Sequence, residues 1–533
     1  MRATHPVDLL PPGPTANTPY ASPLSPVFHR LHPSPETLLL ILSLVIGGVT
    51  GAGVVTFHYL IHLIHTLMLE DLMGVISKAG SWTLACIPTL GGVVIGLMRW
   101  WFRDFGPNMS SLIAATRGLQ ELSPLKPITK MVAASVSLGT GASLGPEAPS
   151  VEIGANFGML LAQVLQLSPE RQRLLLGAGA AAGLSAGFNS PIAGVFFALE
   201  VVLGSTFATS SVSVVLLAAV VSALIAQICL GAQPAFALPV YDVRSPLELP
   251  FYMGLGLLAS LVSLAYTEAI QLAERCFQGK VRGFAWLGRL PRPIHPIIGG
   301  VCVGLVALQL PQILGVGYET VQAMLQDVKF SLPLLLILLF VKLGVTAISL
   351  GSGLVGGIFA PAMFLGASLG SAYGLFLAMV PVLSDRVAGP PAYAMVGMAA
   401  VLAGSARAPL TAILLMFELT RDYRIVLPLM AAVGLSVWLV EYVNHRSAAH
   451  SLNLQQMGVD VALNTPIQAR EVLQDWEDVL GDRIVTELIS CQIPIDREHS
   501  GDREHTGDEP VLAMANAHLP ENVKPLPETK SAV

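Results

Sequence analysis

Apolar residues along this chain gather in long runs that are separated by short polar stretches. Seven runs could cross the roughly 30 Å hydrocarbon core of a membrane as helices, and they cover residues 38–68, 81–102, 211–230, 251–273, 296–310, 333–350 and 425–443. The core of a large soluble protein can contain one or two such runs, but not this many. The pattern therefore predicts an all-α integral membrane protein that crosses the bilayer many times.

Composition agrees with this prediction and adds an orientation. Hydrophobic residues make up 53% of the 533 residues and charged residues only 12%, outside the range of ordinary soluble domains. The loop 275–292 holds five basic residues between two apolar runs, so we expect it on the cytoplasmic side. The net charge of −6 decides little, because much of the acidity lies after residue 450. The five cysteines have no paired spacing, so we expect no disulfide framework, metal or cofactor.

The chain divides into three zones by composition. Residues 1–35 form a flexible leader that is rich in Pro, Ser and Thr and lacks the apolar core of a secretory signal. Residues 36–450 are the membrane domain. Residues 451–533 are polar, and we expect a largely disordered cytoplasmic tail in which residues 466–490 form an amphipathic helix.

Two stretches inside the membrane domain are versions of one another. Residues 137–149 read SLGTGASLGPEAP, and residues 349–361, which lie 212 positions later, read SLGSGLVGGIFAP. At the same offset Lys130 corresponds to Lys342, whereas Glu147 corresponds to Phe359. The chain therefore looks like an internal duplication in which one copy has a carboxylate where the other has an aromatic ring.

A second pair of segments supports the duplication. Residues 176–202 resemble residues 396–420, and Pro191 and Glu200 match Pro409 and Glu418 at an offset of 218. The drift from 212 to 218 is what a loop insertion produces. We expect the two repeats at about residues 36–230 and 245–450, with the substrate site at the interface between them.

The proline positions predict where helices begin. Pro149, Pro191, Pro361 and Pro409 each follow a glycine-rich piece, and Pro suits the first turn of a helix. Glycines before such a start leave backbone N–H groups that can face a ligand. Several positive helix ends that meet in mid-membrane can bind an anion without placing a full positive charge in the lipid. For residues 177–187 (GAGAAAGLSAG) we prefer the alternative, which is close helix packing through small residues.

Together these motifs resemble those of the ClC family of chloride channels and chloride/proton antiporters. The resemblance covers about residues 36–450 and rests on residues 145–149 (GPEAP), residues 188–191 (FNSP) with Glu200 after them, and residues 357–361 (GIFAP). It implies a homodimer in which each subunit has two inverted halves of tilted, partly broken helices and its own anion pathway. The implied function is transport of chloride or a similar small anion, with no enzymatic reaction and no nucleic acid.

The resemblance also assigns roles to residues. Glu147 is similar to the gating glutamate of the family. A carboxylate among amide donors can occupy an anion site, and it loses that attraction when it is protonated. Ile358 and Phe359 are similar to the positions whose backbone N–H groups coordinate the central anion. The full set implied to line the anion site in these two motifs is Gly145, Pro146, Gly357, Ile358 and Phe359. The resemblance makes Glu200 and Glu418 structural or loop-binding carboxylates.

Several positions depart from the family pattern, beginning with Pro146 and Ala148 on either side of Glu147, where the family usually has a basic residue and a glycine. Pro107 and Asn108 lie where the family has a serine-containing anion motif, and Asn108 or nearby amides could replace the hydroxyl. Ala449 and His450 lie where a late tyrosine closes the inner side of the site, so they are the inner-gate candidates. Val201 occupies the position of an internal proton-relay carboxylate. Because Val cannot carry a proton, we favour a passive channel and keep a chloride/proton antiporter as the alternative.

Other classes fit the residues less well. A fluoride or nitrate transporter of the same family and an unrelated secondary transporter of organic anions remain alternatives. An intramembrane enzyme is disfavoured, because the sequence shows no paired-Asp, Ser/Lys or His-cluster motif with membrane spacing. The 83 residues after 450 are too few for paired nucleotide-binding (CBS) modules, and we expect none. We expect the inner membrane of a prokaryote, with an organelle membrane as the alternative and both termini in the cytoplasm.

Overall fold

The computed structural model describes residues 35–72, 80–102, 105, 125–204, 209–231, 248–381, 387–421 and 423–456. Within these ranges the regular elements are all helices, and the only β-type pairing is an isolated antiparallel bridge between Gly145 and Gly357. The predicted all-α fold is confirmed. By their contacts the residues form two units, Met1–Ala449 and His450–Val533.

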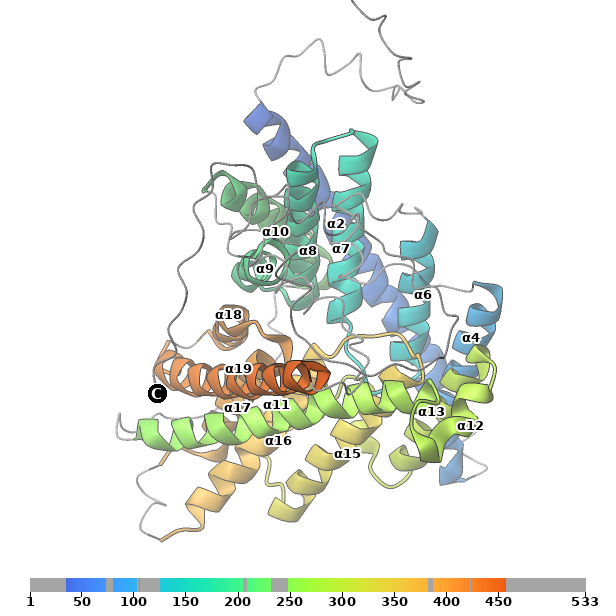
Figure 1. Ribbon diagram of the computed structural model, residues 1–533, viewed down its shortest axis with the longest axis vertical. Coiled ribbons are helices and arrows are strands. Elements are labelled where there is room, and N and C mark those ends of the chain that lie inside the picture. Colours follow the sequence, from blue (N-terminus) through green and yellow to red (C-terminus); the bar gives the residue numbers. More distant parts are fainter. Residues whose placement is uncertain are drawn as a thin grey trace, which may run out of the picture. The chain divides into compact units, whose positions relative to one another are not determined.

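The helices follow the chain in the order shown in Figure 1. The first half contains α2 (Pro35–His65), the π-helical η1 (Thr66–Leu72), η3 (Ser81–Ala85), α4 (Cys86–Trp101), α6 (Leu125–Gly139), α7 (Glu147–Val164), α8 (Pro169–Phe188), α9 (Pro191–Phe197), η4 (Ala198–Leu203) and α10 (Thr209–Leu230). The second half contains α11 (Leu249–Phe277), η6 (Arg282–Phe284), α12 (Ala285–Arg289), η7 (Arg292–Ile294), α13 (His295–Ala307), η8 (Pro311–Ile313), α14 (Tyr318–Leu325), α15 (Leu332–Gly351), α16 (Phe359–Ala378), α17 (Pro390–Ala406), α18 (Pro409–Thr420) and α19 (Val426–Gln456).

Among the described residues, seven helices are long and apolar enough to cross a membrane, or eight if one bent pair counts as a span. Six of them match apolar runs that the sequence predicted. The predicted run at 296–310 is instead part of a pair, Arg282–Arg289 and Arg292–Ala307, bent by 107°. One span, Phe359–Ala378, escaped the prediction because its many small residues lower its mean hydropathy to 1.3. It is also the most enclosed of these spans, with 78% of its apolar window buried inside the protein. The chain is a multi-pass membrane protein.

The two halves repeat the same packing. In the first half α7 packs along α8, and α8 contacts α9. In the second half α16 packs along α17, and α17 contacts α18 (Figure 1). In the same way α6 packs on α2 and α15 packs on α11. The duplicated sequence therefore corresponds to a duplicated arrangement of helices.

Glycines make the closest of these helix contacts possible. A Cβ added at Gly154 in α7 would collide with the Gly179 carbonyl in α8, and one at Gly366 in α16 would collide with the Gly397 carbonyl in α17. These contacts are equivalent, because Gly366 follows Gly154 by 212 positions and Gly397 follows Gly179 by 218. Residues 177–187 therefore serve close helix packing, as expected for small residues in membrane bundles.

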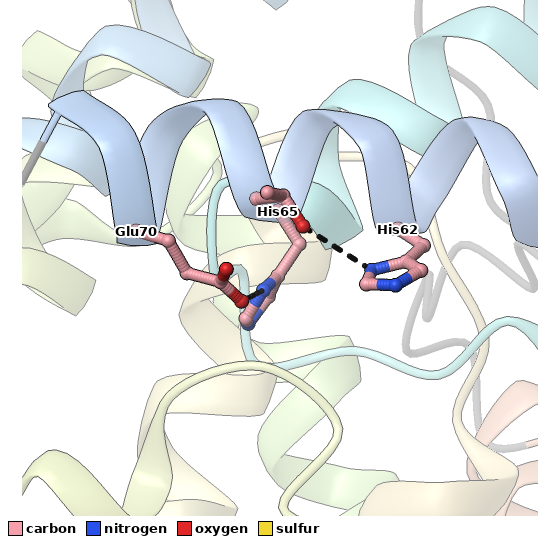
Figure 2. Close-up of polar contacts among 4 residues, drawn as sticks. His62, His65 and Glu70 are labelled. Carbon is pink, nitrogen blue, oxygen red and sulfur yellow. Dashed lines mark hydrogen bonds and ion pairs between the residues drawn. The ribbon is translucent and has the colours of Figure 1, made fainter.

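A small polar cluster lies at the C-terminal end of α2, where this helix continues into η1. His65 Nδ1 lies 4.0 Å from Glu70 Oε1, and the hydroxyl of Thr66 lies 3.4 Å from His62 Nδ1 (Figure 2). The side chains of His65 and Glu70 are 50% and 60% exposed, so this contact contributes little to stability. The described part of the chain holds no group of three His, Cys, Asp or Glu side chains that could bind a metal ion.

Candidate functional site

The two motifs that lie 212 residues apart in sequence meet in space at matching glycines. The Gly145 N–H donates to the Gly357 carbonyl at 2.9 Å, and the Gly357 N–H donates to the Gly145 carbonyl at 2.6 Å. This pair of bonds, the Gly145–Gly357 bridge, joins the two repeats at equivalent atoms. It places the first residues of α7 and α16 next to one another.

The helix starts agree with the positions predicted from proline. Pro191 and Pro409 are the first residues of α9 and α18. Pro149 and Pro361 are the third residues of α7 and α16, which begin at Glu147 and at its counterpart in the other repeat. All four prolines lie in a first turn, where an N–H group has no partner within the helix.

Two of these four helix starts are already paired with carboxylates. Glu418 accepts hydrogen bonds from the N–H groups of Ile192 and Ala193 at 3.0 and 2.8 Å. Glu200 accepts hydrogen bonds from the first residues of α18, at 3.1 Å from Leu410 and at 3.0 Å from the N–H that follows it. These two carboxylates bind backbone at helix starts, which explains why both repeats have a glutamate there. The other two helix starts, those of α7 and α16, supply backbone N–H groups of Glu147 and Ala360 to the Glu147 carboxylate.

Glu147 lies at the Gly145–Gly357 bridge and is only 2% exposed. Its Oε1 accepts a hydrogen bond from the Tyr318 hydroxyl at 3.0 Å. Its Oε2 is buried and has no hydrogen-bond partner among the described residues. A Cβ at Gly357 would lie 3.1 Å from this oxygen, and a Cβ at Gly145 would collide with it. The two glycines thus leave the space that the carboxylate occupies.

The other predicted anion-site residues lie around this carboxylate with unequal donor capacity. The N–H groups of Gly145 and Gly357 bond to each other's carbonyls, and Pro146 has no N–H. In this structure these three residues therefore offer no free backbone N–H group, and their place in an anion site stays a prediction. Ile358 is the N-cap of α16 and Phe359 is its first residue, so their N–H groups have no acceptor within the helix.

Two aromatic contacts hold the start of α16. The Tyr266 hydroxyl, on the fully buried Tyr266 side chain, donates to the Ile358 carbonyl at 3.1 Å. The Phe359 ring packs edge-on against Phe197, with ring centroids 6.0 Å apart. The Phe359 side chain is therefore part of the core packing, and any role in anion binding belongs to its amide.

Comparison with known proteins assigns the family. A family model described as voltage gated chloride channel matches residues 90–441. The chain belongs to this family. The chloride channel proteins CLC-e and CLC-f of Arabidopsis thaliana are 39% and 37% identical to it, over 76% and 78% of this chain. The match spans 60% and 55% of the length of those two plant proteins. The H(+)/Cl(-) exchange transporter ClcA of Salmonella newport is 30% identical, over 74% of this chain and 83% of its own.

Solved structures confirm the ClC fold. A slow cyanobacterial Cl-/H+ antiporter matches with a TM-score of 0.67 at 24% identity, over 78% of this chain and 95% of its own. A CLC-type fluoride/proton antiporter matches with a TM-score of 0.63 at 22% identity, over 76% and 95%. The predicted arrangement of two repeats of partly broken membrane helices is therefore correct.

The positions where this ClC chain departs from the family pattern lie in different parts of the structure. Val201 lies in η4 directly after Glu200 and packs, partly buried, against the core. Ala449 and His450 belong to the last turns of α19, but their side chains lie outside the described part. Pro107 and Asn108 also lie outside the described residues.

Sequence reasoning missed two contributors to the site. Ala148 is the second residue of α7, and a Cβ at Gly357 would lie 2.9 Å from its N–H nitrogen, so this amide lies against the bridge. The sequence does contain a signal for Ala148, because this residue directly precedes Pro149, the last residue of the motif 137–149. Tyr318 has no such signal, because its segment has no counterpart in the repeats that were recognised.

Proposed function

We propose that this protein transports chloride across a membrane through the site at the Gly145–Gly357 bridge, and that Glu147 gates it. The observation that carries the proposal is the position of the Glu147 carboxylate, which is buried at the starts of two helices and receives backbone N–H groups of Glu147 in α7 and Ala360 in α16. An oxygen at that place occupies a position that an anion would take. The name of the matching family and the names of the relatives support chloride as the substrate.

The site suits an anion because its donors are backbone amides at helix starts. The N–H groups of Ala148, Ile358 and Phe359 lie at the N-terminal ends of α7 and α16, where the helix dipole is positive. Such donors attract an anion without a charged side chain in the bilayer, where a full positive charge is costly. Pro107 and Asn108, and Ala449 and His450 at the inner side, remain proposed members of the pathway.

In this proposal the gate works by competition for the same amides. The ionised carboxylate of Glu147 occupies the place of the anion and blocks it. When the carboxylate is protonated, it loses its charge and its attraction to the amides, and chloride replaces it. Flux therefore increases as the pH falls, and a variant without the carboxylate conducts at all pH values.

We favour a passive channel, because Val201 provides no proton carrier beside Glu200. A chloride/proton antiporter is the second candidate. It is supported by the relative ClcA and by two structural neighbours, all of which are exchangers or antiporters by name. Fluoride stays an alternative anion, because one of these neighbours is a fluoride/proton antiporter.

The test is chloride efflux from proteoliposomes with simultaneous recording of the external pH. A passive channel moves no protons against their gradient, whereas an antiporter drives uphill proton movement from a chloride gradient. Glu147→Ala and Glu147→Gln should both conduct chloride without pH dependence. Glu268→Ala, at an exposed glutamate on α11, is the control and should behave as the wild type. A wild-type pH response in both Glu147 variants contradicts the gating role.

We also propose that the protein works as a homodimer in which each subunit has its own pathway, in a prokaryotic inner membrane with both termini in the cytoplasm. Membership in the family supports this arrangement. Cross-linking in native membranes tests the dimer, and protease access from the two sides of the membrane tests the orientation of the termini.

A further inference from the structure

The hydroxyl group of Tyr318 is the side-chain hydrogen-bond donor that the structure shows on the Glu147 carboxylate. Tyr318 is the first residue of α14, a short helix outside the duplicated motifs, and its hydroxyl lies 3.0 Å from Glu147 Oε1. Its side chain is half-buried, whereas Glu147 is almost fully enclosed. Tyr318 is therefore placed to hold the carboxylate from one side while the glycine bridge encloses it from the other.

The loop that leads into Tyr318 is anchored by a buried lysine. Lys342 in α15 is fully buried, and its ammonium group donates to the carbonyls of Ile313 and Gly315 at 3.0 and 2.8 Å. The Gly315 N–H in turn donates to the Gly141 carbonyl at 2.9 Å. The backbone just before Tyr318 is thus tied both to α15 and to the loop of the first motif.

Lys342 also lies over the ring of Phe364, and this ring packs against the backbone at Gly317. Lys342 Nζ is 4.9 Å from the centroid of the Phe364 ring. Gly317, which directly precedes Tyr318, has a φ of 84°, and a Cβ there would lie 2.7 Å from the Phe364 ring. A glycine is required at this position, because other residues rarely adopt that φ and have no room beside the ring.

The other repeat uses its equivalent lysine differently. Lys130 forms an ion pair with Glu152, with Nζ and Oε2 2.7 Å apart. The counterpart of Glu152, 212 positions later, is Phe364. Lys342 therefore has a ring where Lys130 has a carboxylate, and its N–H groups bind the carbonyls of the loop before Tyr318. With a ring in place of the acid, this lysine keeps a contact with α16 but gives its hydrogen bonds to the loop before the tyrosine.

We propose that Tyr318 is the residue that retains Glu147 in its blocking position, and that Lys342 is a positioning residue that acts by holding the loop 313–317. This inference rests on the proposed gating role of Glu147. A hydrogen-bond donor stabilises the ionised carboxylate, because an ionised acceptor forms the stronger bond. Loss of the donor therefore makes the carboxylate easier to protonate and easier for chloride to displace.

Backbone N–H groups of Glu147 and Ala360 also bond to the Glu147 carboxylate, and Tyr318 is the titratable side chain that donates to it. Tyr266, on α11, interacts electrostatically with Glu147 but donates its hydrogen bond to the Ile358 carbonyl. Lys130, on α6, is paired with Glu152 on α7, and Lys342 binds carbonyls of the loop.

The test compares two tyrosine-to-phenylalanine variants of the full chain in proteoliposomes, with chloride efflux measured over a range of pH. In Tyr318→Phe the pH of half-maximal efflux should rise by about one unit, which is the size expected for one lost hydrogen bond to an ionised group. The maximal efflux at low pH should stay the same. Tyr393→Phe is the matched control, because it also removes a buried hydroxyl, one that has no hydrogen-bond partner among the described residues.

The role of Lys342 is tested by rescue and by a double variant. Lys342→Met should shift the half-maximal pH in the same direction as Tyr318→Phe, and Lys342→Arg, which can still donate to the loop carbonyls, should restore it. Lys342→Met combined with Tyr318→Phe should shift no further than Tyr318→Phe alone, because both changes remove the same contact. A full additional shift, or failure of Lys342→Arg to restore the wild-type value, overturns the positioning role.

The pattern of results separates the two proposals. If Tyr318→Phe keeps the wild-type pH profile while Glu147→Ala conducts at every pH, the role of the tyrosine is wrong and the gate stands. If Glu147→Ala keeps the wild-type pH profile, the gate is wrong, and the tyrosine proposal fails with it. An upward shift in Tyr318→Phe alone, with Tyr393→Phe unchanged, supports both.

Discussion

Glu200 and Glu418 each bind the start of the helical segment that carries the other. Glu418, near the end of α18, accepts N–H bonds from the first turn of α9 at 3.0 and 2.8 Å. Glu200, in η4 directly after α9, accepts N–H bonds from the first turn of α18 at 3.1 and 3.0 Å. The duplication thus produces a reciprocal contact. The equivalent glutamate of each repeat accepts hydrogen bonds from the first helical turn of a helix in the other repeat.

This reciprocity predicts that the two glutamates matter for stability. Glu200→Gln and Glu418→Gln should each lower the free energy of unfolding by about 1.5–3 kcal/mol, the usual range for hydrogen bonds to a charged group. The loss arises because the neutral amide is a weaker acceptor and turns an NH₂ group toward N–H donors. Thermal unfolding in detergent measures the effect. Glu268→Gln, on α11, should change stability by less than about 0.5 kcal/mol, and an equal loss in that control would contradict the assignment.

The matched glycine contacts make a second prediction about the repeats. Gly154→Ala and Gly366→Ala should destabilise the protein by similar amounts, about 1–3 kcal/mol, because each new Cβ collides with a carbonyl of the facing helix. Gly48→Ala and Gly434→Ala are the controls, since a Cβ at either position meets nothing within 4 Å. Those two changes should be neutral or stabilising by up to about 1 kcal/mol in a helix. Tolerance of both colliding variants would show that the helices can move apart easily.

Much of this architecture could be predicted from the sequence because it depends on local chemistry. The apolar runs, the helix starts at proline and the position of Glu147 in a duplicated motif all follow from short segments. The span Phe359–Ala378 was missed for a physical reason. Its glycine, alanine and serine residues suit contact with other helices, so its hydropathy is low although 78% of its apolar window is buried.

The parts that could not be predicted depend on contacts between distant segments. Nothing in the two motifs shows that the N–H groups of Gly145 and Gly357 bond to each other's carbonyls. Nothing around Tyr318 shows that it reaches Glu147, 171 positions away. A single tyrosine in a segment without a repeat has no pattern, so its role depends on the three-dimensional arrangement alone.

The glycine bridge itself can be used to open the proposed gate. In Gly357→Ala the new Cβ would lie 3.1 Å from Glu147 Oε2 and 2.9 Å from the Ala148 nitrogen, so the carboxylate loses its place. Chloride efflux at neutral pH should therefore increase several-fold over the wild type, in the direction of Glu147→Ala. The combined variant Gly357→Ala with Glu147→Ala should conduct no better than Glu147→Ala alone. A decrease in efflux that persists in the combined variant would show that the methyl group blocks chloride directly.

The last prediction separates the amide of Phe359 from its ring. The Phe359 ring packs edge-on against Phe197, with centroids 6.0 Å apart, whereas the proposed chloride contact is the backbone N–H. Phe359→Leu and Phe197→Leu both break this ring pair, so each should lower stability by about 0.5–1.5 kcal/mol beyond the loss of buried area. Neither should change the dissociation constant for chloride, measured by titration calorimetry, by more than about threefold, a free energy below about 1 kcal/mol. A tenfold loss of chloride affinity in Phe359→Leu, with Phe197→Leu unaffected, would show that the Phe359 side chain contributes to the site.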